Sequence, residues 1–582
     1  MGTISDKLMR IINTKEDIRQ ALISKGYDVP TSIPFKEYAK MILDLPCNAD
    51  SFPDIEGIVA RYSASGLTNE QMAANPVWVD KTGNGHDLQL KNFAWKGMSG
   101  VGGYVADIDE WGTNSTAAYF ERNSIKITAT FKENASLGLL YHNIKLRQSC
   151  VLKVTGIPEG CDAFLDDRLG NRFYMSEDGV YEIIPSNFLA EALYLSIEKY
   201  PERWYGSKLT IEQLPLYPGF ILGDGVDDFA VTEKELNFED TYTVYTAFIP
   251  FQNNPTRNMI LCGADSKKTF SMQYSSLVYV SFIAGNNYYI NADFVNGLNL
   301  FACKRNGNNI CIKNLLTNKV VTGTCGDWVE NAGLYYLWKN ATYASFAKAA
   351  IAGQTICNGY FSTDEDDEKV LNWYKKQYPW LFPDQAWTVV GKTNEDEDRA
   401  TIANITGNGN DLVLSNFGFA EGSGYNEEGE YAGYLVTDGV DDRVQDSSFK
   451  LNKDWTLVGE WVFLNQKATN AGITKPFSFV VYNRTTGLSL FINTGTSGIT
   501  IENVKSIKAI CSDGRIYFDD WSEMLISKDQ DITSSTSVLS IGFNGTAYTQ
   551  IAFKNLGIYN NQILSKDDCI KAYNYLQTLK SK

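Results

Sequence analysis

The stretch TGNGHDLQLKNFAW at residues 82–95 recurs as TGNGNDLVLSNFGF at residues 406–419, with nine of the fourteen positions identical. Further pairs follow in the same order along the chain. They are DGVDD at 224–228 and again at 438–442, ELNFEDTYTVYTAF at 235–248 with KLNKDWTLVGEWVF at 450–463, KTFSM at 268–272 with KPFSF at 475–479, and KVLNWYKK at 369–376 with KAYNYLQT at 571–578. Ordered self-similarity of this kind predicts two copies of one domain. Whatever the first copy folds into, the second is expected to fold into as well.

The first copy is predicted to contain an insert. The distance between matching motifs shortens by about 110 residues after the first pair, which places extra chain at 96–219 in copy one. That interval has strand-like runs of its own, SIKITATF at 124–131, CVLKVTGIP at 150–158 and LTIEQLPLY at 209–217. A segment of this length is able to close a small β-sandwich.

Strand patterns dominate both copies. Aromatic residues make up 13% of the chain, and runs such as DTYTVYTAFIPF at 240–251 and DWTLVGEWVFL at 454–464 combine aromatic with β-branched side chains. Turn-forming clusters separate the runs, for example NGNN at 306–309. This spacing predicts antiparallel sandwiches rather than β-α-β units.

Bulk properties exclude several classes of function. The net charge of −17 argues against nucleic acid or an anionic membrane as a partner, because both require concentrated Lys and Arg. With only two His, a His-based metal site or a Ser-His-Asp triad is hard to build. The ten Cys form no C-x-x-C pair and are predicted to be buried free thiols. We find neither a membrane span nor a secretory signal, and therefore expect folding in a cytosol.

The first 48 residues are expected to form short helices. Three short helices with so few apolar residues cannot make a stable core alone, so we expect them to dock onto their own chain, a second copy or a larger assembly. The predicted attachment residues are Leu8, Ile11, Ile12, Ile18, Leu22, Phe35, Tyr38 and Ile42.

The order TGNG-x-DL, then DGVDD, then a strand leading into IYNNQILSKDD resembles the LamG, or concanavalin A-like lectin/glucanase, family. Copy two has all three elements, the last with Tyr559, Asn560, Leu564, Ser565, Asp567 and Asp568. Copy one has a weaker third element at 358–376. The resemblance implies a mostly β protein with two concanavalin A-like jelly-roll sandwiches, at 49–382 and 383–582, the first interrupted by the small inserted sandwich.

The N-terminal segment is similar to short segments that precede β-rich modules in tail, baseplate and fibre proteins of bacteriophages, often phages of gut Bacteroidetes. This resemblance implies a virion structural protein, assembled in the host cytoplasm and anchored to capsid or tail proteins by residues 1–48. Homo-oligomerisation, with a trimer as our guess, follows from the same likeness.

Two acidic triplets are candidate calcium sites, and calcium is the one candidate cofactor. They are Asp224, Asp227 and Asp228 in copy one, and Asp438, Asp441 and Asp442 in copy two. Carboxylate oxygens are the ligands that Ca²⁺ prefers. The alternative, which we favour, is a tight turn in which Asp accepts bonds from its own backbone. The run TDEDDE at 363–368 is predicted to cap the helix that follows it.

The glucanase side of the resemblance requires two carboxylates on one strand, written E-x-D-x-E or E-x-D-x-x-E in the family. Neither pattern occurs in the lectin-like parts of this sequence. We therefore expect a protein that is not an enzyme, with a glycan-degrading enzyme or its carbohydrate-binding accessory kept as the alternative.

Glycan binding would use aromatic side chains that stack on sugar faces. The candidates are Trp95, Trp111, Tyr425 and Trp521, each with core or interface packing as the alternative. His86 falls where copy two has Asn410 and is expected to be a turn residue. The expected function is adhesion of a head or tail fibre to host-surface or mucus glycans; a purely architectural virion protein is the second alternative.

Overall fold

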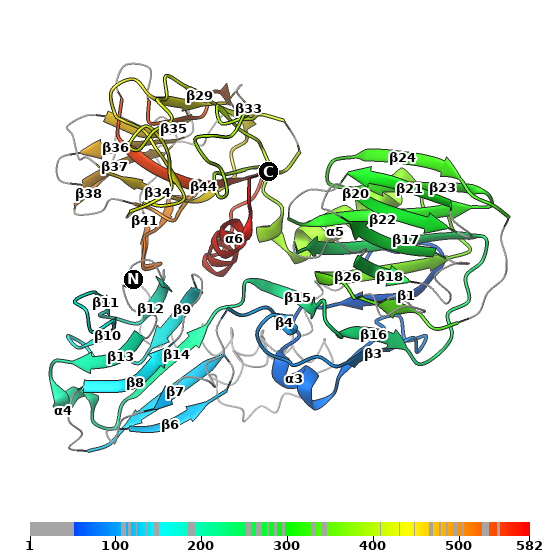
Figure 1. Ribbon diagram of the computed structural model, residues 1–582, viewed down its shortest axis with the longest axis horizontal. Coiled ribbons are helices and arrows are strands. Elements are labelled where there is room, and N and C mark those ends of the chain that lie inside the picture. The colour runs from blue at the N-terminus through cyan, green and yellow to red at the C-terminus, as the bar shows by residue number, and fades with distance from the viewer. Residues whose placement is uncertain are drawn as a thin grey trace, which may run out of the picture.

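The computed structural model of the chain describes residues 52–105, 112–113, 118–123, 125–133, 138–144, 150–183, 193–251, 258–262, 270–275, 279–284, 288–293, 297–327, 333–339, 346–407, 409–429, 431–446, 449–464, 470–475, 479–484, 487–492, 499–502, 506–525, 535–543 and 548–581. Within these residues three β-sandwiches surround a central helix, α6 (Figure 1). The predicted attachment segment, 1–48, lies outside the described residues, as does Trp111.

The first jelly roll consists of two facing antiparallel sheets of eight strands each. One sheet runs β24 (Lys319–Thr324), β23 (Asn309–Asn314), β22 (Asn299–Asn306), β17 (Thr241–Pro250), β26 (Lys348–Asn358), β15 (Tyr217–Asp224) and β4 (Gly100–Gly102), with β1 (Ile58–Ser63) also paired to β26. The other runs β2 (Val77–Trp78), β3 (Leu88–Lys91), β16 (Phe229–Thr232), β25 (Tyr336–Leu337), β18 (Asn258–Cys262), β19 (Phe270–Ser275), β20 (Tyr279–Ala284) and β21 (Tyr288–Asp293).

The second jelly roll repeats this arrangement. One sheet runs β41 (Glu523–Leu525), β40 (Arg515–Tyr517), β39 (Ala509–Cys511), β34 (Trp455–Phe463), β44 (Ile551–Asn560), β31 (Tyr434–Val436) and β30 (Gly424–Asn426), with β27 (Gln385–Thr388) also paired to β44. The other runs β28 (Thr401–Ile402), β29 (Leu412–Ser415), β32 (Arg443–Gln445), β43 (Ser540–Ile541), β35 (Asn470–Lys475), β36 (Phe479–Arg484), β37 (Gly487–Ile492) and β38 (Ile499–Glu502). A separate ribbon pairs β33 (Phe449–Leu451) with β42 (Ser535–Ser537).

The two eight-stranded sheets of one copy correspond strand for strand to those of the other, and their register corrects one detail of the sequence alignment. Thr243 of β17 lies opposite Cys357 of β26, and Thr456 of β34 lies opposite Tyr559 of β44, so the two threonines are equivalent. The alignment of 235–248 with 450–463 instead pairs Thr243 with Val458. The sequences of two buried apolar strands can be aligned almost equally well after a shift of two residues, since every second side chain points to the same face of the sheet.

The insert is a small sandwich of two five-stranded sheets. They run β11 (Arg172–Met175), β10 (Asp162–Asp166), β13 (Leu193–Glu198), β8 (Gly138–Ile144), β5 (Gly112–Thr113), and β12 (Gly179–Ile183), β9 (Cys150–Thr155), β14 (Lys208–Gln213), β7 (Lys126–Phe131), β6 (Ala118–Arg122). These strands lie inside the predicted interval 96–219. The flanking strands β4 and β15 pair with each other in the first jelly roll, with Leu222 opposite Gly100. The chain therefore leaves and re-enters the jelly roll at neighbouring points, which lets an extra domain be inserted without disturbing the sheet.

Two of the described helices, α5 and α6, are long, and the others are short. The described helices are α3 (Asn69–Ala74), α4 (Pro201–Trp204), α5 (Asp364–Gln377) and α6 (Lys566–Thr578), with a 3-10 turn η4 (Pro379–Leu381). The side chain of Thr363 accepts a hydrogen bond from Asp366 N, and the first turn of α5 is acidic, which confirms that 363–368 caps this helix. None of the described helices is long and apolar enough to cross a bilayer.

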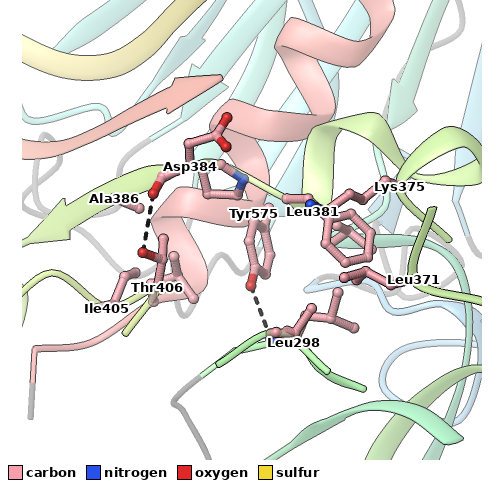
Figure 2. A pocket seen from close by; sticks show the side chains of 13 residues that line it. Leu298, Leu371, Lys375, Leu381, Asp384, Ala386, Ile405, Thr406 and Tyr575 are labelled. Carbon is pink, nitrogen blue, oxygen red and sulfur yellow. Dashed lines mark hydrogen bonds between the residues drawn. The ribbon is translucent and has the colours of Figure 1, made fainter. Parts of the chain in front are cut away.

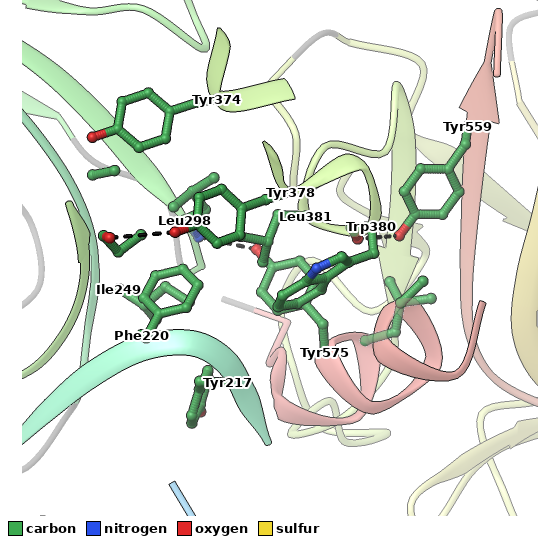
Figure 3. Close-up of a cluster of buried hydrophobic side chains, with 14 of the residues drawn as sticks. Tyr217, Phe220, Ile249, Leu298, Tyr374, Tyr378, Trp380, Leu381, Tyr559 and Tyr575 are labelled. Carbon is green, nitrogen blue, oxygen red and sulfur yellow. Dashed lines mark hydrogen bonds between the residues drawn. The ribbon is translucent and has the colours of Figure 1, made fainter. Parts of the chain in front are cut away.

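Each sandwich has its own core, and a fourth cluster, the junction core, joins the three. Aromatic side chains from β15, α5, η4, β44 and α6 meet there (Figure 3). Trp380 packs edge-on against Tyr575 at 5.9 Å, and the Tyr559 hydroxyl donates to Trp380 O at 2.7 Å. Burial of each such ring contributes roughly 1.5–3 kcal/mol, so the junction core holds the sandwiches against one another. Seven cysteines are free and buried, as predicted, and Cys311 is free and half-buried; the seven are Cys150, Cys161, Cys303, Cys325, Cys357, Cys511 and Cys569.

Candidate functional site

The repeated TGNG turn is a structural element in both copies. In copy one, Asp87 Oδ1 accepts a hydrogen bond from Asp80 N at 2.8 Å, and in copy two Asp411 Oδ1 accepts from Asn404 N at 2.8 Å. The glycines of both turns adopt positive φ, for example 80° at Gly83, a conformation that favours glycine. The turn therefore has a structural role: it leads into the strand that follows, and the hydrogen bonds of its Asp are made within the fold.

A small cavity lies beside the second TGNG turn, between the two jelly rolls (Figure 2). Thr406 Oγ1 donates to Asp384 O at 3.3 Å, and the Tyr575 hydroxyl accepts from Leu298 N at 3.0 Å across the junction. The volume is about 90 Å³, below the 300–1,000 Å³ typical of ligand sites. We interpret this space as a packing gap at the domain boundary.

Each predicted calcium triad gathers three carboxylate oxygens within 4.8 Å of one another. In copy one, Asp228 Oδ2 accepts from Asp224 N at 2.9 Å and Asp224 Oδ1 accepts from Val226 N at 2.7 Å. In copy two the same pair of bonds measures 2.8 and 2.7 Å. Three carboxylate groups suit Ca²⁺. These carboxylates, however, already accept hydrogen bonds from the backbone of their own turn, as expected for a tight turn without a metal ion. The tight turn therefore stays the favoured interpretation, with calcium binding as the other one.

The inner carboxyl group of each triad is buried. Asp228 is 1% exposed and Asp442 is fully buried. Burial raises the pKa of Asp228 to about 7 and that of Asp442 to about 6, while the neighbouring Ser99 and Ser423 hydroxyls oppose the shift. Near neutral pH these groups carry less charge than ordinary aspartates do, which weakens their attraction for a cation.

The predicted stacking residues have different environments. Tyr425 is 2% exposed in the second core, and its hydroxyl donates to Arg399 O at 2.8 Å, so its ring has the core packing that was the alternative to stacking on a sugar. Trp95 is half-buried, with its ring 5.1 Å from Phe93. Trp521 is 3% exposed and packs against Tyr573, yet it forms part of a cavity wall.

That cavity, the interdomain cleft, has a volume of about 510 Å³ and lies between the insert, the β40–β41 hairpin and α6. It is lined by residues 153–155 and 177–180, by Leu214, Pro215 and Pro218, by residues 520–522, and by Lys566, Asp567, Ile570, Lys571 and Asn574. Its walls combine aliphatic side chains with carboxylates, ammonium groups and one amide. Trp521 is the one lining residue among the predicted sugar-binding residues, because the lining residues come together only when the insert docks.

Asn574 of α6 is the one cleft residue with an unsatisfied buried acceptor among those described. Its side chain is 3% exposed, and its Oδ1 atom has no hydrogen-bond partner in the described part of the chain. Leaving a buried acceptor unpaired costs about 1–3 kcal/mol. A ligand hydroxyl that reached this atom would remove that cost.

A buried polar network fixes the insert against α6 next to the cleft. Lys508 Nζ donates to the Tyr573 hydroxyl at 2.6 Å and lies 3.6 Å from Glu182 Oε2. The Tyr573 hydroxyl contacts Glu182 Oε2 and lies 3.1 Å from Glu460 Oε2, which also accepts from Gln577 at 2.6 Å. The network connects the insert, the second jelly roll and α6, which are the elements that also bound the cleft.

Burial and neighbouring charges shift the pKa values of the two carboxyl groups in this network, Glu182 and Glu460. Burial, together with nearby Glu460, raises the pKa of Glu182. Burial acts in the same direction on Glu460, but Lys508 and Lys554 outweigh it and hold its pKa at about 2. Glu460 therefore keeps its charge, while Glu182, on the insert side, holds its proton more strongly than an ordinary glutamate does.

Comparisons with known proteins define no family for this chain. No protein-family model matches the chain, and no curated protein matches it. Among solved structures, the chain is similar to the VIP36 exoplasmic/lumenal domain in its Ca²⁺/Man3GlcNAc-bound form, at 9% identity and a TM-score of 0.20, over 27% of this chain and 86% of that one. It is also similar to the binding domain of botulinum neurotoxin DC in complex with SialylT, at 12% identity and a TM-score of 0.24, over 56% of this chain and 87% of that one. We base the fold on strand order, and draw nothing about function from likenesses of this size.

Proposed function

We propose that this chain is a non-enzymatic carbohydrate-binding protein and that the interdomain cleft is its main sugar site. Ligand sites favour domain interfaces and volumes of 300–1,000 Å³, and the cleft of about 510 Å³ meets both conditions. The observation that carries the proposal is that Asn574 lines this cleft and that its Oδ1 atom has no hydrogen-bond partner in the described part of the chain.

The lining suits a ligand that is polar at its edges and apolar on its faces. Val180 and Ile570 offer aliphatic surface, and Trp521 contributes to the wall beside them. Lys153 and Asp567 are exposed, so their charged groups are free to reach sugar hydroxyls. Hydroxyl groups both donate and accept, so a sugar can pair with amide, ammonium and carboxylate groups together.

We further propose that the chain is a virion fibre, anchored by residues 1–48 to capsid or tail proteins, and that it adheres to host-surface or mucus glycans. The support is the sequence resemblance of the N-terminal segment. In a homo-oligomer, with a trimer as our guess, several weak sugar sites would act together and raise the avidity.

A glycan array tests the sugar-binding proposal. Ser522 is exposed and lines the cleft, so Ser522→Trp is expected to fill it and abolish the glycan signals of the wild-type protein. Ser65→Trp, at an exposed position of the first jelly roll outside the cleft, is the matched control and should keep them. Absence of any glycan signal from folded wild-type protein would refute the proposal, and release of sugar products would favour the enzyme alternative.

A further inference from the structure

A second cavity, the hairpin pocket, lies in the first jelly roll between the β23–β24 hairpin and α5. Its volume is about 520 Å³, and the residues that define it here are Lys313, Asn318, Val320, Asp364, Asp367 and Glu368. It shares no lining residue with the interdomain cleft.

The hairpin pocket and the interdomain cleft lie at equivalent places in the two copies. Each is bounded by the outermost hairpin of the sheet and by the helix that follows the last long strand. Asn318 and Trp521 lie in the two hairpin loops with φ of 56° and 61°. In copy two the insert covers this place, whereas in copy one no described residue of the insert lines the pocket.

Register identifies equivalent residues beneath the two sites. Lys304 lies opposite Thr243, and Cys511 lies opposite the equivalent Thr456. Likewise Asp367 and Cys569 each occur four residues after the capping residue of their helix. A buried ion pair in copy one therefore takes the place of two buried thiols in copy two.

The ion pair is deeply buried. Lys304 Nζ lies 2.8 Å from Asp367 Oδ2, with the two side chains 4% and 2% exposed. Lys313 Nζ lies 3.0 Å from the same oxygen and 2.6 Å from Asp364 Oδ1, and the Tyr245 hydroxyl donates to Asp367 Oδ1 at 2.9 Å.

Burying charges of this kind is often no more stabilising than apolar packing. Copy two builds the same part of the fold with Cys511 and Cys569, so the jelly roll does not require charges there. The jelly-roll fold therefore does not explain the charged cluster of copy one. This cluster borders the hairpin pocket.

We propose that the hairpin pocket is a second sugar site and that it takes neutral sugars; this proposal rests on the proposed function. The lining has three carboxylates, Asp364, Asp367 and Glu368, which outnumber by one the ammonium groups of Lys313 in the lining and of Lys304 beneath it. This negative excess repels sialic and uronic acids but accepts hydrogen bonds from sugar hydroxyls. Val320, which is 52% exposed, offers an apolar surface for the CH face of a sugar ring.

Saturation-transfer NMR with the methyl glycosides of glucose, galactose, mannose and N-acetylglucosamine tests the proposal on the full-length chain. Ser522→Trp blocks the interdomain cleft, and Val320→Trp, at an exposed position, fills the hairpin pocket. We expect the Ser522→Trp variant to retain binding of at least one neutral glycoside, and the double variant to lose it. Glu368→Ala in the Ser522→Trp background should weaken the retained binding several-fold, whereas Glu365→Ala on the same helix, outside the pocket lining, should not.

Two outcomes would refute sugar binding in the hairpin pocket and leave the proposed sugar site in the interdomain cleft intact. In the first, Ser522→Trp alone removes all neutral glycoside binding. In the second, the binding retained by Ser522→Trp survives the addition of Val320→Trp. If the wild-type protein binds only acidic sugars, the proposal for the hairpin pocket is refuted, whereas the proposal of carbohydrate binding is not. If the protein binds no sugar in the NMR experiment or on the glycan array, both proposals are refuted.

Discussion

The hydroxyl group of Tyr573, on the last helix, is hydrogen bonded to Glu182 of the insert, a residue 391 positions earlier in the chain. This contact joins a domain inserted in the first copy to the second copy. It makes the interdomain cleft a product of the whole chain, because neither copy alone supplies both walls.

Removing this hydroxyl should loosen the insert. We expect Tyr573→Phe to lower the free energy of unfolding by about 1–3 kcal/mol, because Glu182, whose side chain is only 11% exposed, loses a hydrogen-bond partner. Urea unfolding measures the loss, and hydrogen exchange should rise along β12. Tyr119→Phe, at a tyrosine of the insert that is 68% exposed, is the control and should change little. Equal stability of the two variants would show that the contact does not hold the insert.

Asp228 should make stability fall as pH rises. Its pKa is about 7 in the folded chain, above its ordinary value of 3.8, so between about pH 4 and 7 the folded state retains a proton that the unfolded state releases. The free energy of unfolding therefore decreases over that window, and Asp228→Asn should flatten the decrease. Asp227→Asn, at the exposed residue of the same turn, controls for the loss of charge. Parallel pH profiles for wild type and Asp228→Asn would contradict the shift.

Calcium should leave the melting temperature unchanged if the acidic triads only close turns. We expect this result, because the inner carboxyl of each triad is buried and accepts a backbone hydrogen bond. Thermal melts with millimolar CaCl₂ or a chelator measure the effect. A concentration-dependent rise of Tm that Asp227→Ala and Asp441→Ala remove would establish a site instead.

The N-terminal segment is expected to act independently of the sandwiches. Deleting residues 1–46 should leave the melting temperature of the β domains unchanged and should prevent the protein from joining virus particles. Particle incorporation is scored by immunoblot of purified virions. Normal incorporation of the truncated chain would refute the attachment role.

Much of the fold could be predicted from the sequence because turns have local signatures. The TGNG and DGVDD motifs marked equivalent turns in both copies, and the change in their spacing located the insert. The candidate site could not be predicted in the same way. Exposure of Tyr425 depends on strands far away in sequence, and the replacement of Lys304 and Asp367 by Cys511 and Cys569 is visible only from strand register. Asn574 has no local signal at all, since its role depends on where the insert docks.

The most direct measurement of the central claim pairs affinity with stability in Asn574→Leu. Leucine has a similar shape and removes the unsatisfied acceptor, so the free energy of unfolding should stay the same or rise. Affinity for the best glycan on the array, measured by calorimetry, should fall roughly tenfold or more, about 1.4 kcal/mol per factor of ten. Unchanged affinity in a variant of equal or greater stability would contradict sugar binding in the interdomain cleft.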